Sequence, residues 1–118
     1  MPADGAVHRV EALGGEALYE AVSPITTDCF DYCLAHASPE VALRLPSDIP
    51  ATITGAITNI MKYARIELGS VEYLLDAEGQ PRFIDLNPVS SLRPEAAHLL
   101  GRDPIDCIAE YLWERLGP

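Results

Sequence analysis

The sequence predicts an α+β fold in which a mainly antiparallel sheet packs against helices. Two pairs of short apolar runs, each pair interrupted by a turn signal, predict two strand pairs. Two longer segments with apolar residues three and four positions apart predict helices. With 118 residues, of which 48% are hydrophobic and 22% charged, the chain is expected to form one folded unit over residues 1–118.

The first strand pair is expected at residues 7–13 and 16–22, joined at Gly14-Gly15. Residues 23–39 follow with two Ser-Pro pairs and no hydrophobic period, which predicts a long loop. A loop of this length beside a two-strand unit could exchange between two copies of the chain, so a homodimer is one possible assembly.

A helix is expected next. Ser47 or Asp48 would cap it, Pro50 suits its first turn, and Gly69 stands where a helix end favours glycine. Its apolar positions recur at helical spacing: Ile53, Ile57, Ile60, Met61, Ala64 and Leu68.

The second strand pair is expected at 71–76 and 82–86, around a turn at 77–80. A short helix is expected after Pro94, and a last helix after Pro104. The last helix carries an apolar stripe, beside which Trp113 is expected to pack: Ile105, Ile108, Ala109, Leu112 and Leu116.

The charge pattern excludes several classes of partner. A formal charge of −10 argues against nucleic acid and anionic membranes, which need basic patches. No stretch approaches the ~20 apolar residues that cross a bilayer, and the first ten residues contain no apolar segment of the kind found in signal peptides. A phosphate ligand would require a cation as its companion.

The three cysteines, an odd number without an export signal, predict reduced thiols and a cytoplasmic protein. Cys29, Cys33 and His36 resemble a zinc-ligand spacing but lack a fourth ligand. Buried or loop thiols are therefore the favoured interpretation.

The second strand pair carries the chemistry. A turn centred on residues 78–79 places Glu72 opposite Asp85, Leu74 opposite Phe83 and Asp76 opposite Pro81. Asn87, two residues beyond Asp85, shares its face. The other face then collects an apolar set suited to a core: Val71, Tyr73, Leu75, Ile84 and Leu86.

Two carboxylates directly opposite each other destabilise a sheet unless one takes up a proton or a cation lies between them. Magnesium prefers oxygen ligands, often one or two carboxylates together with phosphates and water. Glu72, Asp85 and the Asn87 amide oxygen supply such a set. The alternative is an exposed hairpin face with solvated acids.

The run LGSVEYLLDAEGQPRFIDLNPVSS resembles the C-terminal metal-binding part of the ATP-grasp superfamily, which includes D-alanine–D-alanine ligases and biotin carboxylases. The resemblance implies that Glu72, Asp85 and Asn87 bind the magnesium (or manganese) ions of bound ATP. It also implies that Leu74 lines the adenine pocket. HRVEALGGEALYEAV and GRDPIDCIAEYLWERL resemble other parts of the same region, but only the hairpin is specific.

The resemblance implies an ATP-dependent ligase that activates a small carboxylate as an acyl phosphate for attack by an amine or thiol. Family members carry earlier subdomains with phosphate-binding lysines and an adenine-binding hinge. These are absent here, so the chain alone is expected to be inactive and to need those N-terminal subdomains or a partner chain. The alternative function is a non-catalytic binding or dimerisation module that retains the fold.

The chain departs from the family pattern near the hairpin. Val89 stands where some members have an arginine, and Arg93 is the nearest basic residue. Arg93 is the candidate contact for a transferred phosphate or an acid substrate, against a surface or helix-entry role. Lys62 is expected at the surface of the helix, and His8 and Arg9 are strand residues that could face the cleft.

Overall fold

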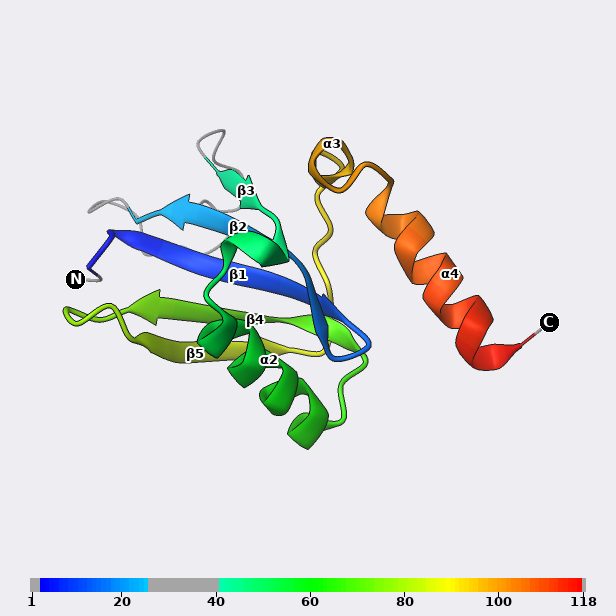
Figure 1. The fold of residues 1–118 in the computed structure, drawn as a ribbon, viewed down its shortest axis with the longest axis horizontal. Coiled ribbons are helices and arrows are strands. Elements are labelled where there is room, and N and C mark those ends of the chain that lie inside the picture. The colour runs from blue at the N-terminus through cyan, green and yellow to red at the C-terminus, as the bar shows by residue number, and fades with distance from the viewer. Residues whose placement is uncertain (1–2, 26–40, 118) are drawn as a thin grey trace.

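The computed structural model describes residues 3–25 and 41–117. Its elements, in chain order, are β1 (Ala6–Leu13), β2 (Glu16–Pro24), β3 (Ala42–Arg44), the 3₁₀ turn η1 (Pro46–Asp48), α2 (Ala51–Ala64), β4 (Leu68–Leu75), β5 (Pro81–Asn87), α3 (Ala96–Leu100) and α4 (Pro104–Leu116). The predicted α+β fold is confirmed (Figure 1).

All strand pairs are antiparallel, and they form one five-stranded sheet in the order β3-β2-β1-β4-β5. β1 therefore lies at the centre, between its hairpin partner β2 and the distant strand β4. β3, which the sequence did not predict, pairs with β2 through three residues only. The predicted loop over 23–39 is shorter at its start, because Ser23 and Pro24 belong to β2; positions 26–39 lie outside the described residues.

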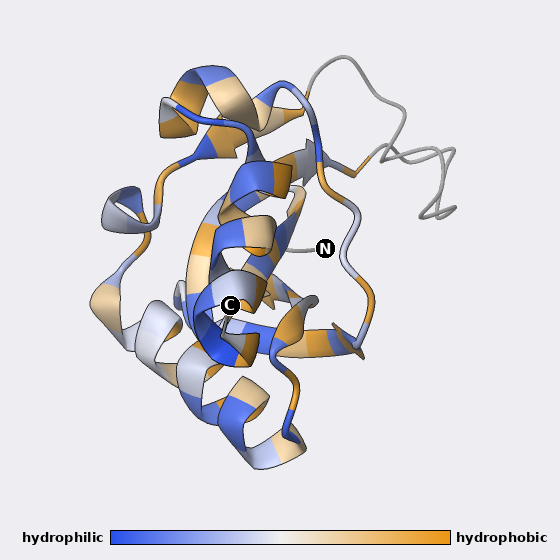
Figure 2. Ribbon diagram, turned by 90° about the vertical axis from the view of Figure 1, so that its right-hand side faces the viewer, coloured by the Kyte–Doolittle hydropathy of each residue, from blue (hydrophilic) through white to orange (hydrophobic). Residues whose placement is uncertain are grey.

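α2 covers one face of the sheet and makes the core. Its buried residues Ile53, Ile57 and Met61 pack against side chains of β1 and β4. The strand residues of this core are Val10, Ala12, Val71 and Tyr73. Figure 2 shows hydrophobic and hydrophilic residues alternating along the strands, as expected where one face is apolar and the other polar.

The predicted ends of the central helix are wrong. Ser47 and Asp48 lie in η1, and Pro50 is the residue before the first helical turn. At the other end Arg65 adopts a left-handed conformation (φ 58°), and its N–H is donated to the Lys62 and Met61 carbonyls. The helix therefore stops before Leu68, which belongs to β4 together with Gly69.

Gly69 has a packing role instead. A Cβ at this position would lie 2.2 Å from the backbone oxygen of Asn87. Glycine is thus required for the close approach of β4 to the end of β5.

The register of the second hairpin is confirmed at one end and wrong at the other. Glu72 lies opposite Asp85, but a bulge follows, so Leu74 lies opposite Arg82 and Leu75 opposite Pro81. The bulge brings the Phe83 ring to 5.8 Å from the Tyr73 ring, edge to face.

The predicted apolar face is correct for β4 and wrong for β5. Val71 and Tyr73 are buried in the core, whereas Ile84 is 52% and Leu86 37% exposed. β5 is an edge strand, beyond the buried side chains that α2 contributes. Burial under a helix, rather than alternation alone, decides which of these residues join the core.

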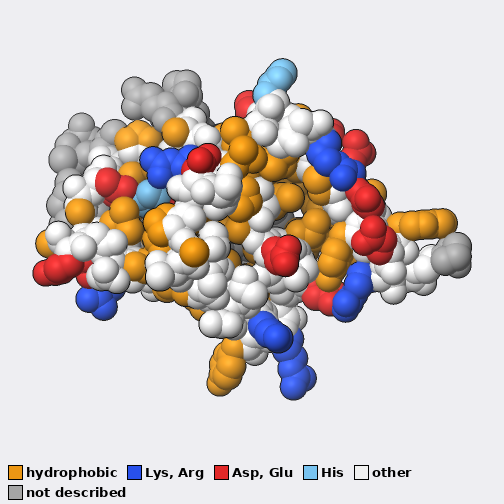
Figure 3. All heavy atoms as spheres, in the orientation of Figure 1, with side chains coloured by type: hydrophobic (Ala, Val, Ile, Leu, Met, Phe, Trp, Pro, Cys, Tyr) orange, Lys and Arg blue, Asp and Glu red, His pale blue; other side chains and the backbone are white. Residues whose placement is uncertain are grey.

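α4 extends from the body of the molecule (Figure 1). Its side chains Ile105, Leu112, Trp113 and Leu116 are exposed, and Figure 3 shows hydrophobic side chains projecting at this end. Trp113, expected to pack beside the stripe, is 64% exposed. In the described residues no helix is long and apolar enough to cross a membrane.

Candidate metal site on the polar face of the sheet

The face of the sheet opposite α2 carries the predicted site residues. Glu72 on β4 pairs directly with Asp85 on β5, and Ser70 pairs with Asn87. Because side chains alternate along a strand, Asn87 lies on the same face as Asp85. The Asn87 Nδ2 donates to Asp85 Oδ2 at 3.1 Å.

The central strand adds two charged residues to this face. Arg9 pairs with Glu72, and Glu11 pairs with Ser70, so both point to the face of Glu72. Arg9 donates from Nε to Glu11 Oε1 at 2.7 Å and from Nη1 to Glu72 Oε1 at 3.1 Å. All three side chains are buried, whereas Asp85 is exposed.

Burial and charge together raise the pKa of Glu72 to about 7. Desolvation is the main cause; Arg9 opposes it, and the negative charges of Asp85 and Glu11 add to it. The positive charge of Arg9 therefore does not fully offset the free-energy cost of burying the Glu72 carboxylate.

The segment after β5 runs across this face. We call residues 88–95 the strap. Ser90 Oγ on the strap donates to Glu11 Oε2 at 2.6 Å, and the Arg93 N–H donates to the Tyr19 hydroxyl at 2.8 Å. Since Glu11 lies on β1 and Tyr19 on β2, the strap passes from the edge strand over the centre of the sheet before α3 (Figure 1).

The Tyr19 hydroxyl lies close enough to Glu11, Arg9 and Arg93 for their charges to shift its pKa. Tyr19 is fully buried, and burial raises the pKa of its hydroxyl to about 12. The hydrogen bond from the Arg93 backbone lowers this pKa, Glu11 raises it, and the charges of Arg93 and Arg9 lower it. Arg93 thus lies within electrostatic range of the same face as Glu11.

Leu74 shares this face as well, because it follows Glu72 by two residues on β4. It is half-buried. Of the two first-strand residues expected near the site, only Arg9 lies on this face of the sheet. His8 lies on the opposite face, where its ring stacks on Tyr73.

His8 belongs to a second buried polar cluster. Its Nε2 lies 2.5 Å from Asp4 Oδ2 and its Nδ1 lies 3.2 Å from Glu20 Oε1, which also accepts from the Tyr73 hydroxyl. Burial alone would lower the pKa of His8, but the bonds and charges of Glu20 and Asp4 outweigh it and raise the pKa. This cluster ties the N-terminal residues to the sheet.

The donor chemistry of the polar face fits a hard divalent cation. With all groups ionised, the charges of Glu11, Glu72, Asp85 and Arg9 leave a net charge of −2. Within residues 3–25 and 41–117 no three His, Cys, Asp or Glu side chains form a metal cluster by themselves. The predicted set has two carboxylates and one amide, and magnesium usually completes such a set with phosphate and water.

Cys29, Cys33 and His36 lie outside the described residues.

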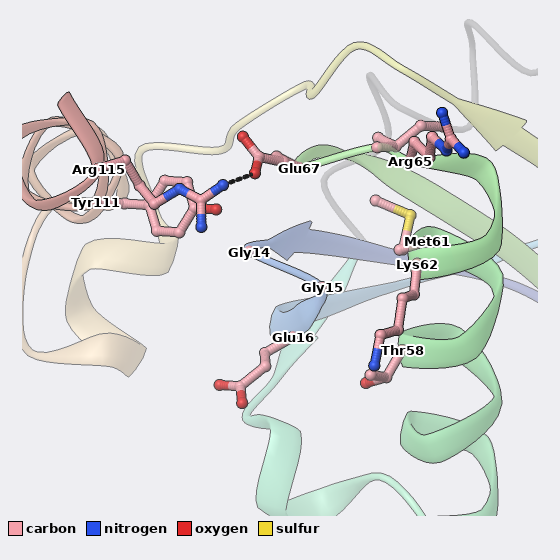
Figure 4. A pocket seen from close by; sticks show the side chains of 11 residues that line it. Gly14, Gly15, Glu16, Thr58, Met61, Lys62, Arg65, Glu67, Tyr111 and Arg115 are labelled. Carbon is pink, nitrogen blue, oxygen red and sulfur yellow. Dashed lines mark hydrogen bonds and ion pairs between the residues drawn. The ribbon is translucent and has the colours of Figure 1, made fainter.

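A separate cavity of about 640 Å³ lies between α4, the β1–β2 turn and the end of α2 (Figure 4). Tyr111 and Arg115 line it from α4, and Arg115 forms an ion pair with Glu67. Lys62 lines it from α2 and is exposed, as expected. Glu72, Asp85 and Asn87 do not line this cavity, so the predicted site is a surface of the sheet rather than part of this pocket.

Sequence reasoning missed Glu11, Tyr19 and Ser90. The alternation of Arg9 and Glu11 on one strand was a usable signal, since it places both on one face. No local signal, however, indicated that this strand pairs with Glu72 across more than 60 residues of chain.

No protein-family model matches the chain, and no curated protein does either. Among solved structures, the ATP-grasp ligase PsnB complexed with a phosphomimetic variant of its minimal precursor, Mg and ADP matches 96% of this chain with a TM-score of 0.67 and 12% identity. PsnB complexed with its minimal precursor matches 96% with a TM-score of 0.64 and 15% identity.

The macrocyclase MdnC from Microcystis aeruginosa MRC, bound with precursor peptide MdnA, matches 98% of this chain with a TM-score of 0.63 and 20% identity. The chain covers only 33% to 35% of the protein chain in each of these three structures. The fold of the chain is therefore that of one part, about a third, of an ATP-grasp ligase.

Proposed function

We propose that this chain is the C-terminal, metal-binding part of an ATP-grasp ligase and that its polar face binds ATP with magnesium or manganese. The observation that carries the proposal is the Glu72–Asp85 pair. Glu72 is a buried carboxylate opposite a second acid, and it shares the Arg9 guanidinium with Glu11, which leaves negative charge for a cation to neutralise.

Glu72, Asp85 and Asn87 are the proposed metal ligands, and Leu74 is proposed to contact the adenine ring. Bound magnesium would neutralise charge on the phosphates during transfer. Arg93 is proposed to contact the transferred phosphate or the acid substrate. Its backbone bond to Tyr19 supports this role, because it holds this residue on the same face as the ligands.

The proposed reaction of the whole ligase is activation of a carboxylate as an acyl phosphate, followed by attack of an amine or thiol. PsnB was solved with its minimal precursor, and MdnC with precursor peptide MdnA. This supports a peptide carboxylate as the acid substrate of the ligase to which the chain belongs. The remaining two thirds would supply further contacts to ATP and peptide.

A thermal shift experiment tests the proposal. A ligand that binds only the folded state stabilises it, by about 1.4 kcal/mol at ten times its dissociation constant. For a domain of this size that is a rise of roughly 5 °C in Tm. We expect millimolar Mg²⁺ or Mn²⁺ to raise the Tm of the wild-type chain.

Asp85→Asn should abolish this rise, and it should increase the Tm of the metal-free protein because it relieves the like-charge pair. Asp48→Asn, at an exposed aspartate of η1, is the matched control and should keep the full metal effect. A wild-type melting curve that does not respond to either ion would contradict the proposal.

A second candidate function is a non-catalytic binding or dimerisation module. The exposed apolar side chains of α4 favour it, since such a stripe is usually covered by a partner. Light scattering of the wild type and of Trp113→Glu tests it. A dimer that dissociates in the variant would support this function.

A further inference from the structure

Glu11 is buried beneath the strap and makes two strong contacts. One carboxylate oxygen accepts from Arg9 Nε at 2.7 Å, and the other accepts from Ser90 Oγ at 2.6 Å. Its side chain is 2% exposed, and that of Arg9 is 7% exposed. A carboxylate held at both oxygens has little freedom to rotate away from Arg9.

Arg9 lies between two buried carboxylates, each 2% exposed, at unequal hydrogen-bond distances. Its Nε bond to Glu11 is shorter than its Nη1 bond to Glu72, which is 3.1 Å. Charge-assisted bonds of the first length are among the stronger ones in proteins. Glu11 therefore takes a share of the guanidinium charge that also acts on Glu72.

This division of charge matters for a metal ion. A guanidinium paired only with Glu72 would compete with a divalent cation for the same carboxylate, because both need its negative charge. Glu11 also holds the strap. It accepts a hydrogen bond from Ser90, which lies three residues beyond the proposed ligand Asn87.

We infer that Glu11 is a positioning residue, which holds Arg9 beside Glu72 so that Glu72 stays available to the divalent cation, and which anchors the strap through Ser90. The inference rests on the proposed function, since it concerns the affinity of the same metal site.

A double-mutant cycle with Mn²⁺ as the probe tests the inference. Binding is measured by electron paramagnetic resonance of free Mn²⁺ on wild type, Glu11→Gln, Arg9→Met and the double variant. Removing the Glu11 charge should weaken binding about fivefold or more when Arg9 is present, and less than about twofold when Arg9 is methionine.

If the Glu11 charge acted only at long range, the effect of its removal would not depend on Arg9. Glu11→Gln would then weaken Mn²⁺ binding by the same factor in both backgrounds, and that result would overturn the inference while leaving the metal site in place. No Mn²⁺ binding by the wild type would overturn the proposed function and the inference together.

Two further measurements separate a positioning role of Glu11 from a general loss of folding in the variants. Ser90→Ala removes only the bond to the second oxygen of Glu11, so it should weaken Mn²⁺ binding by a smaller factor, again only with Arg9 present. In metal-free protein the Arg9 Nε–H should give a slowly exchanging NMR signal that Glu11→Gln abolishes. The same signal in both proteins would show that Glu11 does not hold Arg9. Glu16→Gln, at an exposed glutamate of β2, is the control in both assays.

Discussion

At the scale of single residues, Glu72 is a buried acid on the polar face of the sheet. It is 2% exposed yet lies opposite an exposed acid on the edge strand. Burial raises the native pKa of Glu72 to about 7 from an ordinary value of 4.5. The native state therefore binds this proton more tightly than the unfolded state does.

The free energy of unfolding should accordingly fall as pH rises from about 4.5 to about 7. Above that pH it should stay at the lower value, because Glu72 is then ionised in both states. At about 1.4 kcal/mol for each pKa unit, the fall is on the order of 3–4 kcal/mol. Urea denaturation of wild type and Glu72→Gln across this range gives the difference due to Glu72. Millimolar Mg²⁺ should reduce the fall in wild type. Parallel curves for the two proteins would contradict the assignment.

His8 predicts a second pH effect at a higher range. Its pKa is raised above 6.5 by Glu20 and Asp4, although burial opposes this, so the protonated ring stabilises the native state. This stabilisation is complete below pH 6.5 and is lost as pH rises through the native pKa. Chemical denaturation from pH 6 to 9 should show the loss in wild type and not in His8→Gln. An equal pH dependence in both proteins would exclude a role for His8.

At the scale of elements, the approach of β4 to the end of β5 depends on Gly69. An added Cβ would lie 2.2 Å from the Asn87 oxygen and 2.9 Å from Ile66 Cγ2. Gly69→Ala should therefore destabilise the protein by about 3 kcal/mol or more and displace Asn87, removing the metal-dependent rise in Tm.

Gly55→Ala is the matched control for this substitution. Gly55 lies exposed in α2 with no atom within 4 Å of an added Cβ, so alanine should stabilise the helix by about 0.5–1 kcal/mol. Denaturation curves of both variants measure this difference in stability. Similar stability in the two would mean that β4 and β5 can separate without cost.

The docking of α4 depends on the turn between β1 and β2. A Cβ on Gly14 would lie 2.7 Å from the Tyr111 ring, whereas a Cβ on Gly15 meets no atom within 4 Å. Both glycines have positive φ, 64° and 82°, so alanine strains both by about 1 kcal/mol. Gly14→Ala alone should also speed hydrogen exchange in α4. Equal exchange in the two variants would show that Tyr111 does not hold the helix.

At the scale of the whole molecule, the chain spans a third of the ligases whose fold it shares. Phosphoryl transfer needs the phosphate to be positioned and its charge neutralised from several sides. The polar face would supply the metal side of that arrangement. We therefore predict that the isolated 118-residue chain binds ATP–Mg weakly and catalyses no ligation.

Calorimetric titration of ATP with magnesium, together with an assay of ADP release in mixed carboxylates and amines, tests this prediction. Micromolar binding and steady ADP production that disappears in Glu72→Ala would show a self-sufficient chain. Restored affinity after addition of the other two thirds of such a ligase would support the split-site interpretation.

The sequence by itself determined the elements whose signals are local. Alternation, the turn at residues 77–80 and helical spacing identified both hairpins, α2 and α4, and the burial argument paired Glu72 with Asp85 correctly. The C-terminal end of α2 and the bulge were missed. α2 ends at one left-handed residue, Arg65, and the bulge changes the pairing of β4 with β5 beyond Glu72, and neither has a signal in the local pattern.

Only the tertiary structure decided that β1 lies between β2 and β4. That pairing joins residues more than 60 positions apart and has no signal in the local pattern, yet it brings Arg9 and Glu11 to the face of Glu72. The course of the strap over Glu11 and Tyr19 has the same origin. Local patterns determined which residues form the hairpin, and long-range strand pairing determined which charges surround it.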